Sequence, residues 1–228
     1  NSAMVRIGGG VAPLADLRLD FDDASGLSAA SLGVSAELVD PTAAALLSRL
    51  PMGGGALVPT ELPLMITIEP STLGGLSFRR VVHVELHTHA LVYTAGSRYR
   101  LLKAPLGGAF RDITGSVSPG SVRTRGTTGG FSQFLVVLDA RPTLDVVSGK
   151  LARLRTEAAK LPALEAAPLQ AQLDAIESGL GDERYADAIG AAAMKVAGRS
   201  CGSTTCHSID QPLAPSSRAA SIRSGRTL

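Results

Sequence analysis

The sequence predicts a mainly β protein, with an antiparallel β-sandwich in residues 1–141 followed by a C-terminal α-helical hairpin in residues 142–200. In the first part, short runs of alternating apolar and polar residues are separated by turns rich in Gly and Pro, as is typical of sandwiches. After Arg141-Pro142, apolar residues recur instead at the spacing of amphipathic helices. The chain has 228 residues, 45% of them hydrophobic, which is enough to bury a core.

Seven segments of the first part have the alternation or the β-branched content of strands. We expect strands at Ala15–Phe21, Val34–Val39, Leu64–Glu69, Val81–Tyr93, Tyr99–Ala104, Ser121–Thr127 and Ser132–Leu138. Between the second and the third of these, Asp40-Pro41 precedes a run rich in Ala and Leu. Because proline is favoured in the first turn of a helix, this run predicts a short helix.

Residues 142–200 predict two or three short helices. Thr143 is a suitable N-cap, and the apolar stripe that follows it predicts a first helix up to Leu161, ended by Pro162. We expect a second helix over Pro168–Gly181, with the proline in its first turn, and a third that begins at Asp182.

The expected strand Val81–Tyr93 contains three of the four histidines of the chain. Its even positions are almost all apolar, so the side chains of His83, Glu85, His87 and His89 share the opposite face. Residues two apart along a strand are separated by about 6.6–6.8 Å, so His87 and His89 can reach one ion. Glu85 is the nearest third ligand, and His83, about 13 Å from His87, lies at the outer limit. The pattern predicts a zinc or copper site; the alternative is a polar face whose histidines are hydrogen-bonded.

Residues 201–228 contain Cys201 and Cys206, the only two cysteines, and are rich in Ser, Arg and Pro beyond them. We expect a mobile tail in which a disulfide between Cys201 and Cys206 closes a small loop. Two alternatives stay open: a metal site made by the two thiolates with His207, and covalent haem attachment to the Cys-x-x-x-x-Cys-His pattern.

Three carboxylates, Asp20, Asp22 and Asp23, come just before Gly26. Carboxylates at this density can hold calcium, but the segment lacks the later bidentate Glu of an EF-hand. We therefore expect Asx-turn hydrogen bonds at the end of a strand.

Four segments carry a resemblance to known modules: Val84–His89, Arg100–Pro105, Phe110–Thr114 and Gly130–Val137. Together they resemble the β-sandwich modules of exported bacterial proteins, including Ig-like and ZU5-like domains. The helical part is similar to the small hairpins that follow such modules in bacterial surface proteins. The resemblance implies an Ig-like sandwich, export to the periplasm, cell surface or medium, and a non-catalytic role.

The sequence lacks the motifs of the common hydrolase, nucleotide-binding and zinc-protease sites. The net charge of +2 does not favour nucleic-acid binding, and no apolar run reaches the ~20 residues of a transmembrane segment. We expect a non-enzymatic binding or assembly module with a protein or surface partner and no cofactor. The alternative is a zinc- or copper-binding protein, or a metal-dependent enzyme, built on the histidine pair of the expected strand.

Overall fold

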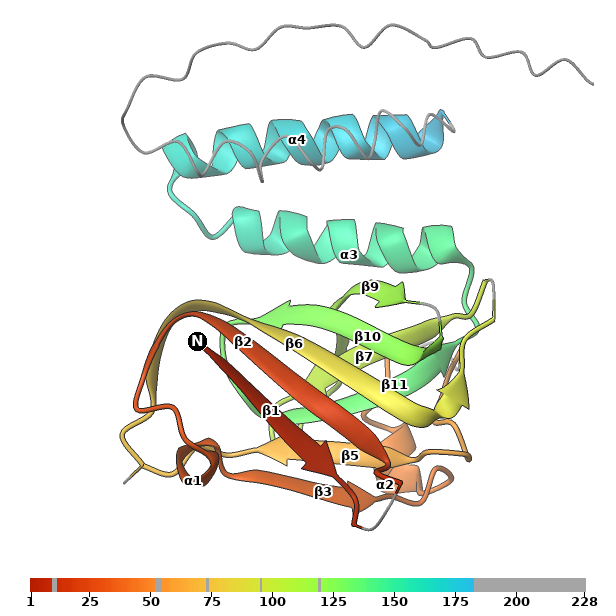
Figure 1. Cartoon of the computed structure of the whole chain (residues 1–228). Helices are drawn as coiled ribbons and strands as arrows, with labels where there is room; N and C mark the ends of the chain where they lie inside the picture. The colour runs from red at the N-terminus through yellow and green to blue at the C-terminus, as the bar shows by residue number, and fades with distance from the viewer. Residues whose placement is uncertain (10–11, 52–54, 73, 95, 119, 183–228) are drawn as a thin grey trace, which may run out of the picture. The chain divides into compact units, whose positions relative to one another are not determined.

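The computed structural model describes residues 1–182 except for residues 10–11, 52–54, 73, 95 and 119. The chain divides into two compact units, Asn1–Val146 and the residues from Val147 onward. Figure 1 shows the strands of the first unit and the helices of the second, which are described separately below.

One layer of the first unit is a five-stranded antiparallel sheet, here called sheet A, in the order β1-β2-β6-β10-β9. Its long strand β6 pairs with β2 on one side and with β10 on the other. The bounds are β1 (Ser2–Ile7), β2 (Ala15–Ser25), β6 (Ser77–Val92), β10 (Ser121–Thr128) and β9 (Thr114–Ser118).

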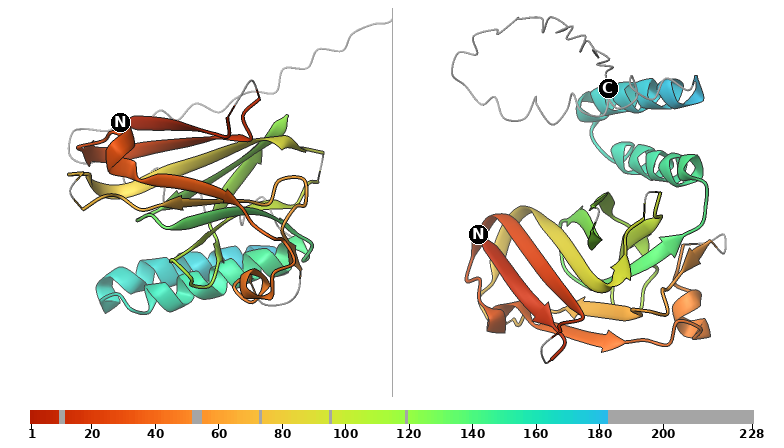
Figure 2. Two further views of the ribbon diagram at one scale, coloured as in Figure 1. Left: turned by 90° about the horizontal axis from the view of Figure 1, so that it is seen from below. Right: turned by 45° about the vertical axis from the view of Figure 1, so that its right-hand side comes forward.

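The other layer, sheet B, is six-stranded, in the order β3-β5-β11-β7-β8 with β4 paired to the end of β11. Figures 1 and 2 show the two sheets as separate layers of this unit, with the short helices near sheet B. The bounds are β3 (Val34–Leu38), β4 (Ala56–Leu57), β5 (Leu64–Ile68), β7 (Tyr99–Ala104), β8 (Arg111–Asp112), β11 (Gln133–Asp139), α1 (Ala29–Leu32) and α2 (Ala44–Leu47).

The main core lies between the sheets, where sheet A contributes residues such as Leu17 and Leu86, and sheet B contributes Ile66 and Phe134. A second core covers the other face of sheet B with side chains from α2 and the neighbouring loops. The central strands β5 and β11 of sheet B are therefore buried on both faces. Sheet A buries one face only, and its other face carries polar side chains.

The prediction of a mainly β chain with two antiparallel sheets and a C-terminal helix pair is confirmed, as are all seven predicted strands and the short helix. Four strands, β1, β4, β8 and β9, were not predicted; β4 and β8 have only two residues each, whereas β1 does alternate and was missed. The predicted turn at Asp20–Gly26 is wrong, because β2 continues to Ser25 in pairing with β6.

The second unit contains α3 (Thr143–Ala158) from Val147 onward and α4 (Ala163–Gly181), and the two helices share an apolar seam. Arg155 adds ion pairs at 2.7 Å to Asp174 and at 2.5 Å to Glu177, so the two helices are linked by charge as well. The seam consists of Val147, Leu151, Ala158, Leu169, Leu173, Ile176 and Leu180.

The predicted start of the second helix at Pro168 is wrong: α4 begins at Ala163, directly after Pro162, and Pro168 lies inside it. The Ala-, Leu- and Glu-rich residues before Pro168 are strong helix formers, and the carbonyl of Pro162 accepts the backbone N–H groups of Glu165 and Ala166. The third helix, expected from Asp182, falls outside the described residues.

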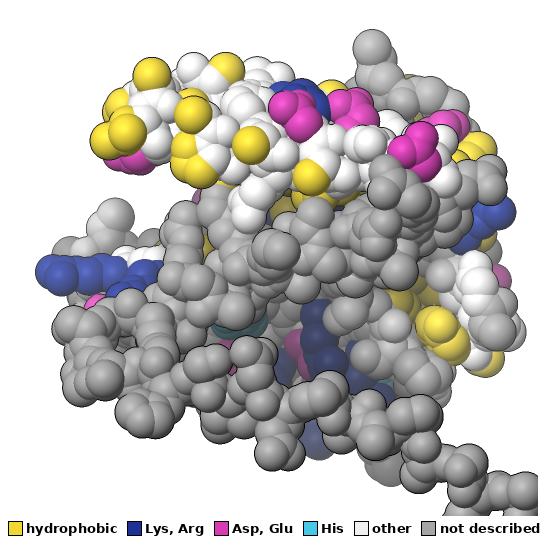
Figure 3. Space-filling model, turned by 90° about the horizontal axis from the view of Figure 1, so that it is seen from above, with side chains coloured by type: hydrophobic (Ala, Val, Ile, Leu, Met, Phe, Trp, Pro, Cys, Tyr) yellow, Lys and Arg dark blue, Asp and Glu magenta, His cyan; other side chains and the backbone are white. Residues whose placement is uncertain are grey.

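The surface of the helical unit mixes apolar and acidic side chains. Leu154 and Leu164 are exposed, as are the carboxylates that pair with Arg155. Figure 3 shows hydrophobic side chains and carboxylates interspersed on this surface. None of the described helices is long and apolar enough to cross a membrane.

Candidate functional site

The outer face of sheet A is a ladder of charged and polar side chains on three neighbouring strands. The alternation of β6 turns Val84 and Leu86 into the core and leaves His83, Glu85, His87 and His89 outside. The registers of β2 and β10 then set three rows across the face: Asp16–His87–Arg123, Arg18–Glu85–Arg125 and Asp20–His83–Thr127.

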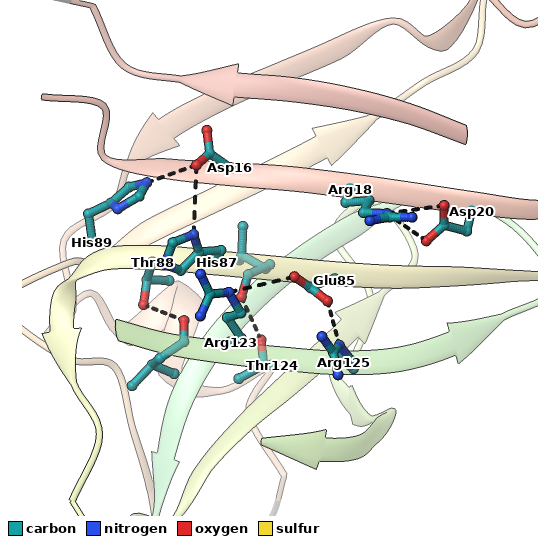
Figure 4. A network of polar contacts seen from close by, with 12 residues as sticks. Asp16, Arg18, Asp20, Glu85, His87, Thr88, His89, Arg123, Thr124 and Arg125 are labelled. Carbon is teal, nitrogen blue, oxygen red and sulfur yellow. Dashed lines mark hydrogen bonds and ion pairs between the residues drawn. The ribbon is translucent and has the colours of Figure 1, made fainter. Parts of the chain in front are cut away.

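Asp16 and His87 of the first row form a cluster with His89 near one end of β6. The ligand atoms of Asp16, His87 and His89 all lie within 4.8 Å of one another. His89 Nε2 is 2.9 Å from Asp16 Oδ2, and His87 Nδ1 is 3.7 Å from the same oxygen. Figure 4 shows both imidazoles directed at this carboxylate, which comes from the adjacent strand β2. The two rings are also neighbours, with centroids 4.3 Å apart.

The environment of His87 favours its neutral form. Burial lowers the pKa of its imidazole, and the neighbouring Arg123 and His89 lower it further, against the opposing effects of Asp16 and Glu85. Its side chain is only 17% exposed, and its buried Nε2 has no hydrogen-bond partner among the described residues. A neutral imidazole is the form that binds metals, so the environment of His87 favours the form of the ring that a metal site requires.

The other two predicted ligands are held elsewhere. Glu85 accepts a hydrogen bond from Arg125 Nε and lies 3.9 Å from Arg123 Nε, so it neutralises cations instead of joining the cluster. His83 Nε2 lies 3.5 Å from Asp22 Oδ1. The structure thus brings together His87 and His89 of the four predicted residues.

Asp16 is the member of the cluster that the sequence did not reveal. Its position in the alternating segment Ala15–Phe21 places it on the polar face of a strand, which is a usable signal. That signal does not say which strand lies alongside. The antiparallel register that sets Asp16 opposite His87 arises from a contact between residues 71 positions apart in the chain.

Two imidazoles and one carboxylate suit late transition metals such as zinc and copper better than calcium, which takes 6–8 oxygen ligands. Arg6 lies 3.8 Å from Asp16, so the carboxylate charge is partly balanced and the attraction for hard cations is weakened. Three protein ligands leave a further coordination position open.

A cavity of about 260 Å³ lies farther along the same face, at the rows of Glu85 and His83. It does not include the three clustered residues. Its lining consists of Asp20, His83, Val84, Glu85, Gly115, Ser116, Arg125, Gly126 and Thr127.

The predicted disulfide between Cys201 and Cys206, and the alternatives that include His207, lie outside the described residues. Two of the carboxylates considered for calcium interact with different side chains. Both carboxylate oxygens of Asp20 accept the N–H of Arg18 Nε, and Asp22 Oδ1 lies 3.5 Å from His83 Nε2.

A family model described as "Family of unknown function (DUF6689)" matches residues 1–206, and the chain therefore belongs to that family. The search of curated proteins found no match.

Proposed function

We propose that this member of the DUF6689 family is a non-enzymatic metal-binding protein that holds one zinc or copper ion at Asp16, His87 and His89. The observation that carries the proposal is the convergence of these three ligand atoms within 4.8 Å, from two strands that the sequence separates widely. A metal would be the natural partner for two imidazoles and a carboxylate in this arrangement.

The backbone supports the geometry. Asp16 and His87 are direct register partners in the antiparallel pairing of β2 and β6. The backbone N–H of His89 donates to the carbonyl of Leu14 at 3.1 Å, which extends the pairing past the cluster. Because both strands are held on each side of the ligands, little conformational entropy has to be lost when an ion binds.

Binding is favoured over catalysis by the position of the cavity beside Glu85. Three-ligand zinc sites in enzymes keep an open position that faces a substrate cleft. The lining of this cavity includes none of the three clustered residues. The function we propose is therefore to hold or carry the ion.

A second candidate is the binding or assembly role of an exported bacterial Ig-like or ZU5-like module. It is favoured by strand β3, which pairs only with β5 and leaves its other edge unpaired among the described residues. Leu38 on this strand is 62% exposed. An unpaired edge of this kind can accept a strand from a protein partner.

The test is metal loading of the full chain in a Cys201→Ser/Cys206→Ser background, which removes the thiolates as competing ligands. Metal-stripped protein is incubated with zinc or copper, desalted and analysed for bound metal. We expect one ion per chain, and loss of that ion in His87→Ala, His89→Ala and Asp16→Asn. His83→Ala is the matched control, since it removes a histidine from the same face of the same strand but outside the cluster.

Failure to retain metal in the background protein would refute the proposal. Equal retention in Asp16→Asn and in the background would also refute it, because the carboxylate from β2 is what distinguishes this site from a simple His-x-His pair. If His83→Ala were the only variant to lose the metal, the ion would have to bind near His83, away from the cluster.

A further inference from the structure

The cavity beside Glu85 has features of a ligand site separate from the metal cluster. We propose that it binds a neutral, hydroxyl-rich ligand, namely a single sugar ring or the end of a saccharide chain. The inference goes beyond metal binding and does not depend on it, because Asp16, His87 and His89 are absent from the lining.

The hollow is created by two glycines and an irregularity in pairing. Register between β9 and β10 shifts between Arg125 and Gly126, which leaves Gly115 as an extra residue of β9. Such a bulge bends the strand and interrupts the row of side chains. Gly126 is required there, since a Cβ on it would lie 2.3 Å from the carbonyl oxygen of Ile113. The volume of about 260 Å³ is below the range of drug-sized ligands, so one sugar ring is a suitable size.

The fixed charges around the cavity are already balanced. Asp20 is paired with Arg18 at 2.9 Å, and Glu85 is paired with Arg125 and lies near Arg123. A charged ligand would add an uncompensated charge to this balanced set. A hydroxyl group can instead donate to an unused carboxylate lone pair and accept from an unused N–H of Arg125, with both pairs intact.

The remaining lining adds neutral hydrogen-bonding groups. The side chains of Ser116 and Thr127 are exposed, and neither makes a hydrogen bond with another described residue. His83 is half exposed and supplies a ring that donates or accepts. The lining thus offers both hydrogen-bond donors and acceptors, as a ring with several hydroxyls requires, together with some apolar surface.

The experiment is saturation-transfer-difference NMR on the full-length, metal-stripped protein. The probes are glucose, galactose, mannose and N-acetylglucosamine, with glucuronate and glucose 6-phosphate as anionic counterparts. The blocking variant is Gly115→Phe, because a Cβ at this position meets only the Arg125 carbonyl oxygen at an ordinary 3.7 Å and aromatic residues are favoured in strands. The matched control is Gly129→Phe, where a Cβ would have open space and which lies outside the lining.

We expect at least one neutral sugar to bind and Gly115→Phe to weaken it by roughly tenfold or more, with Gly129→Phe unchanged. Thr127→Val, which removes one hydroxyl and keeps the β-branched shape, should weaken the same sugar by a smaller factor. Binding of the anionic probes alone would overturn the neutral-ligand inference. Absence of binding by all probes, or equal binding by the two Phe variants, would overturn the site itself. A thermal melt of each variant shows that it remains folded.

Discussion

Sheet A and sheet B have the same antiparallel pairing but different surroundings. The centre of sheet B is covered on both faces, so all five residues of β5 are buried, as are six of the seven residues of β11. On sheet A, β6 buries alternate residues from Val82 to Thr88, and the residues between them lie outside, where they form ion pairs and the Asp16–His87–His89 cluster. The comparison indicates that sheet B maintains the fold, whereas the outer face of sheet A is available for function.

The largest effect should come from truncating the centre of sheet B. Phe134 is 0% exposed and lies in the main core between the sheets. Phe134→Ala should lower the free energy of unfolding by about 3–5 kcal/mol, through lost burial and the cavity left behind. Urea denaturation measures this. Arg18→Ala removes an exposed side chain from sheet A and is the control. An equal loss of unfolding free energy in this variant would contradict the difference between the two sheets.

Metal should stabilise the protein through sheet A alone. In the Cys201→Ser/Cys206→Ser background, zinc at about 100 times its dissociation constant should raise the free energy of unfolding by about 2.7 kcal/mol. His89→Ala should remove this gain and leave the stability without zinc nearly unchanged, since its side chain is partly exposed. Denaturation curves with and without zinc provide the measurement. A gain that persists in His89→Ala would place the ion elsewhere.

Sheet B also contains a charged residue, but its role is structural. Asp139 is 1% exposed and accepts hydrogen bonds from Arg141 Nε at 2.8 Å and Nη2 at 2.6 Å. Burial by itself would raise the pKa of Asp139, but the hydrogen bonds and charge of Arg141 outweigh it and hold the pKa below its usual value. Asp139→Asn should cost about 1.5–3 kcal/mol near neutral pH.

The pH dependence checks the cause of that loss. A carboxyl whose pKa is lowered on folding stabilises the fold at pH values above its ordinary pKa of about 3.8. This stabilisation disappears as the pH falls through the folded-state pKa. The difference between Asp139→Asn and the unsubstituted protein should therefore shrink in acid. A difference that is constant from pH 7 down to the acid transition would exclude a role for the charge.

The smallest effect concerns His87. Because its pKa is lowered on folding, the folded protein favours the neutral ring. Its contribution to stability is complete above the ordinary pKa of about 6.5 and is lost as the pH falls through the lower folded-state pKa. His87→Gln should flatten the pH dependence of stability in this range for the metal-free protein. His83→Gln is the control, and an equal flattening there would contradict the special environment of His87.

Alternation in the sequence predicted strands of sheet A such as β2 and β6, because a half-buried strand must separate apolar from polar side chains. The strands β5 and β11 of sheet B do not alternate, and their apolar and β-branched residues predicted them instead. It also placed His87 and His89 correctly on one face. Pro168 misled the prediction of α4, since local helix formers before it outweighed the cost of an internal proline. The two-residue strands β4 and β8 have no pattern to recognise, and only pairing with their neighbours defines them.

The sequence by itself determined the mainly β fold, the place of the helix pair along the chain and the polar face of β6, because each follows from local periodicity. Only the tertiary structure decided which strand lies beside β6, and so that Asp16 and not Glu85 approaches the two histidines. It also decided that Glu85 is neutralised by arginines from β10. Register between distant strands depends on how the whole core packs, and no local pattern in the chain records it.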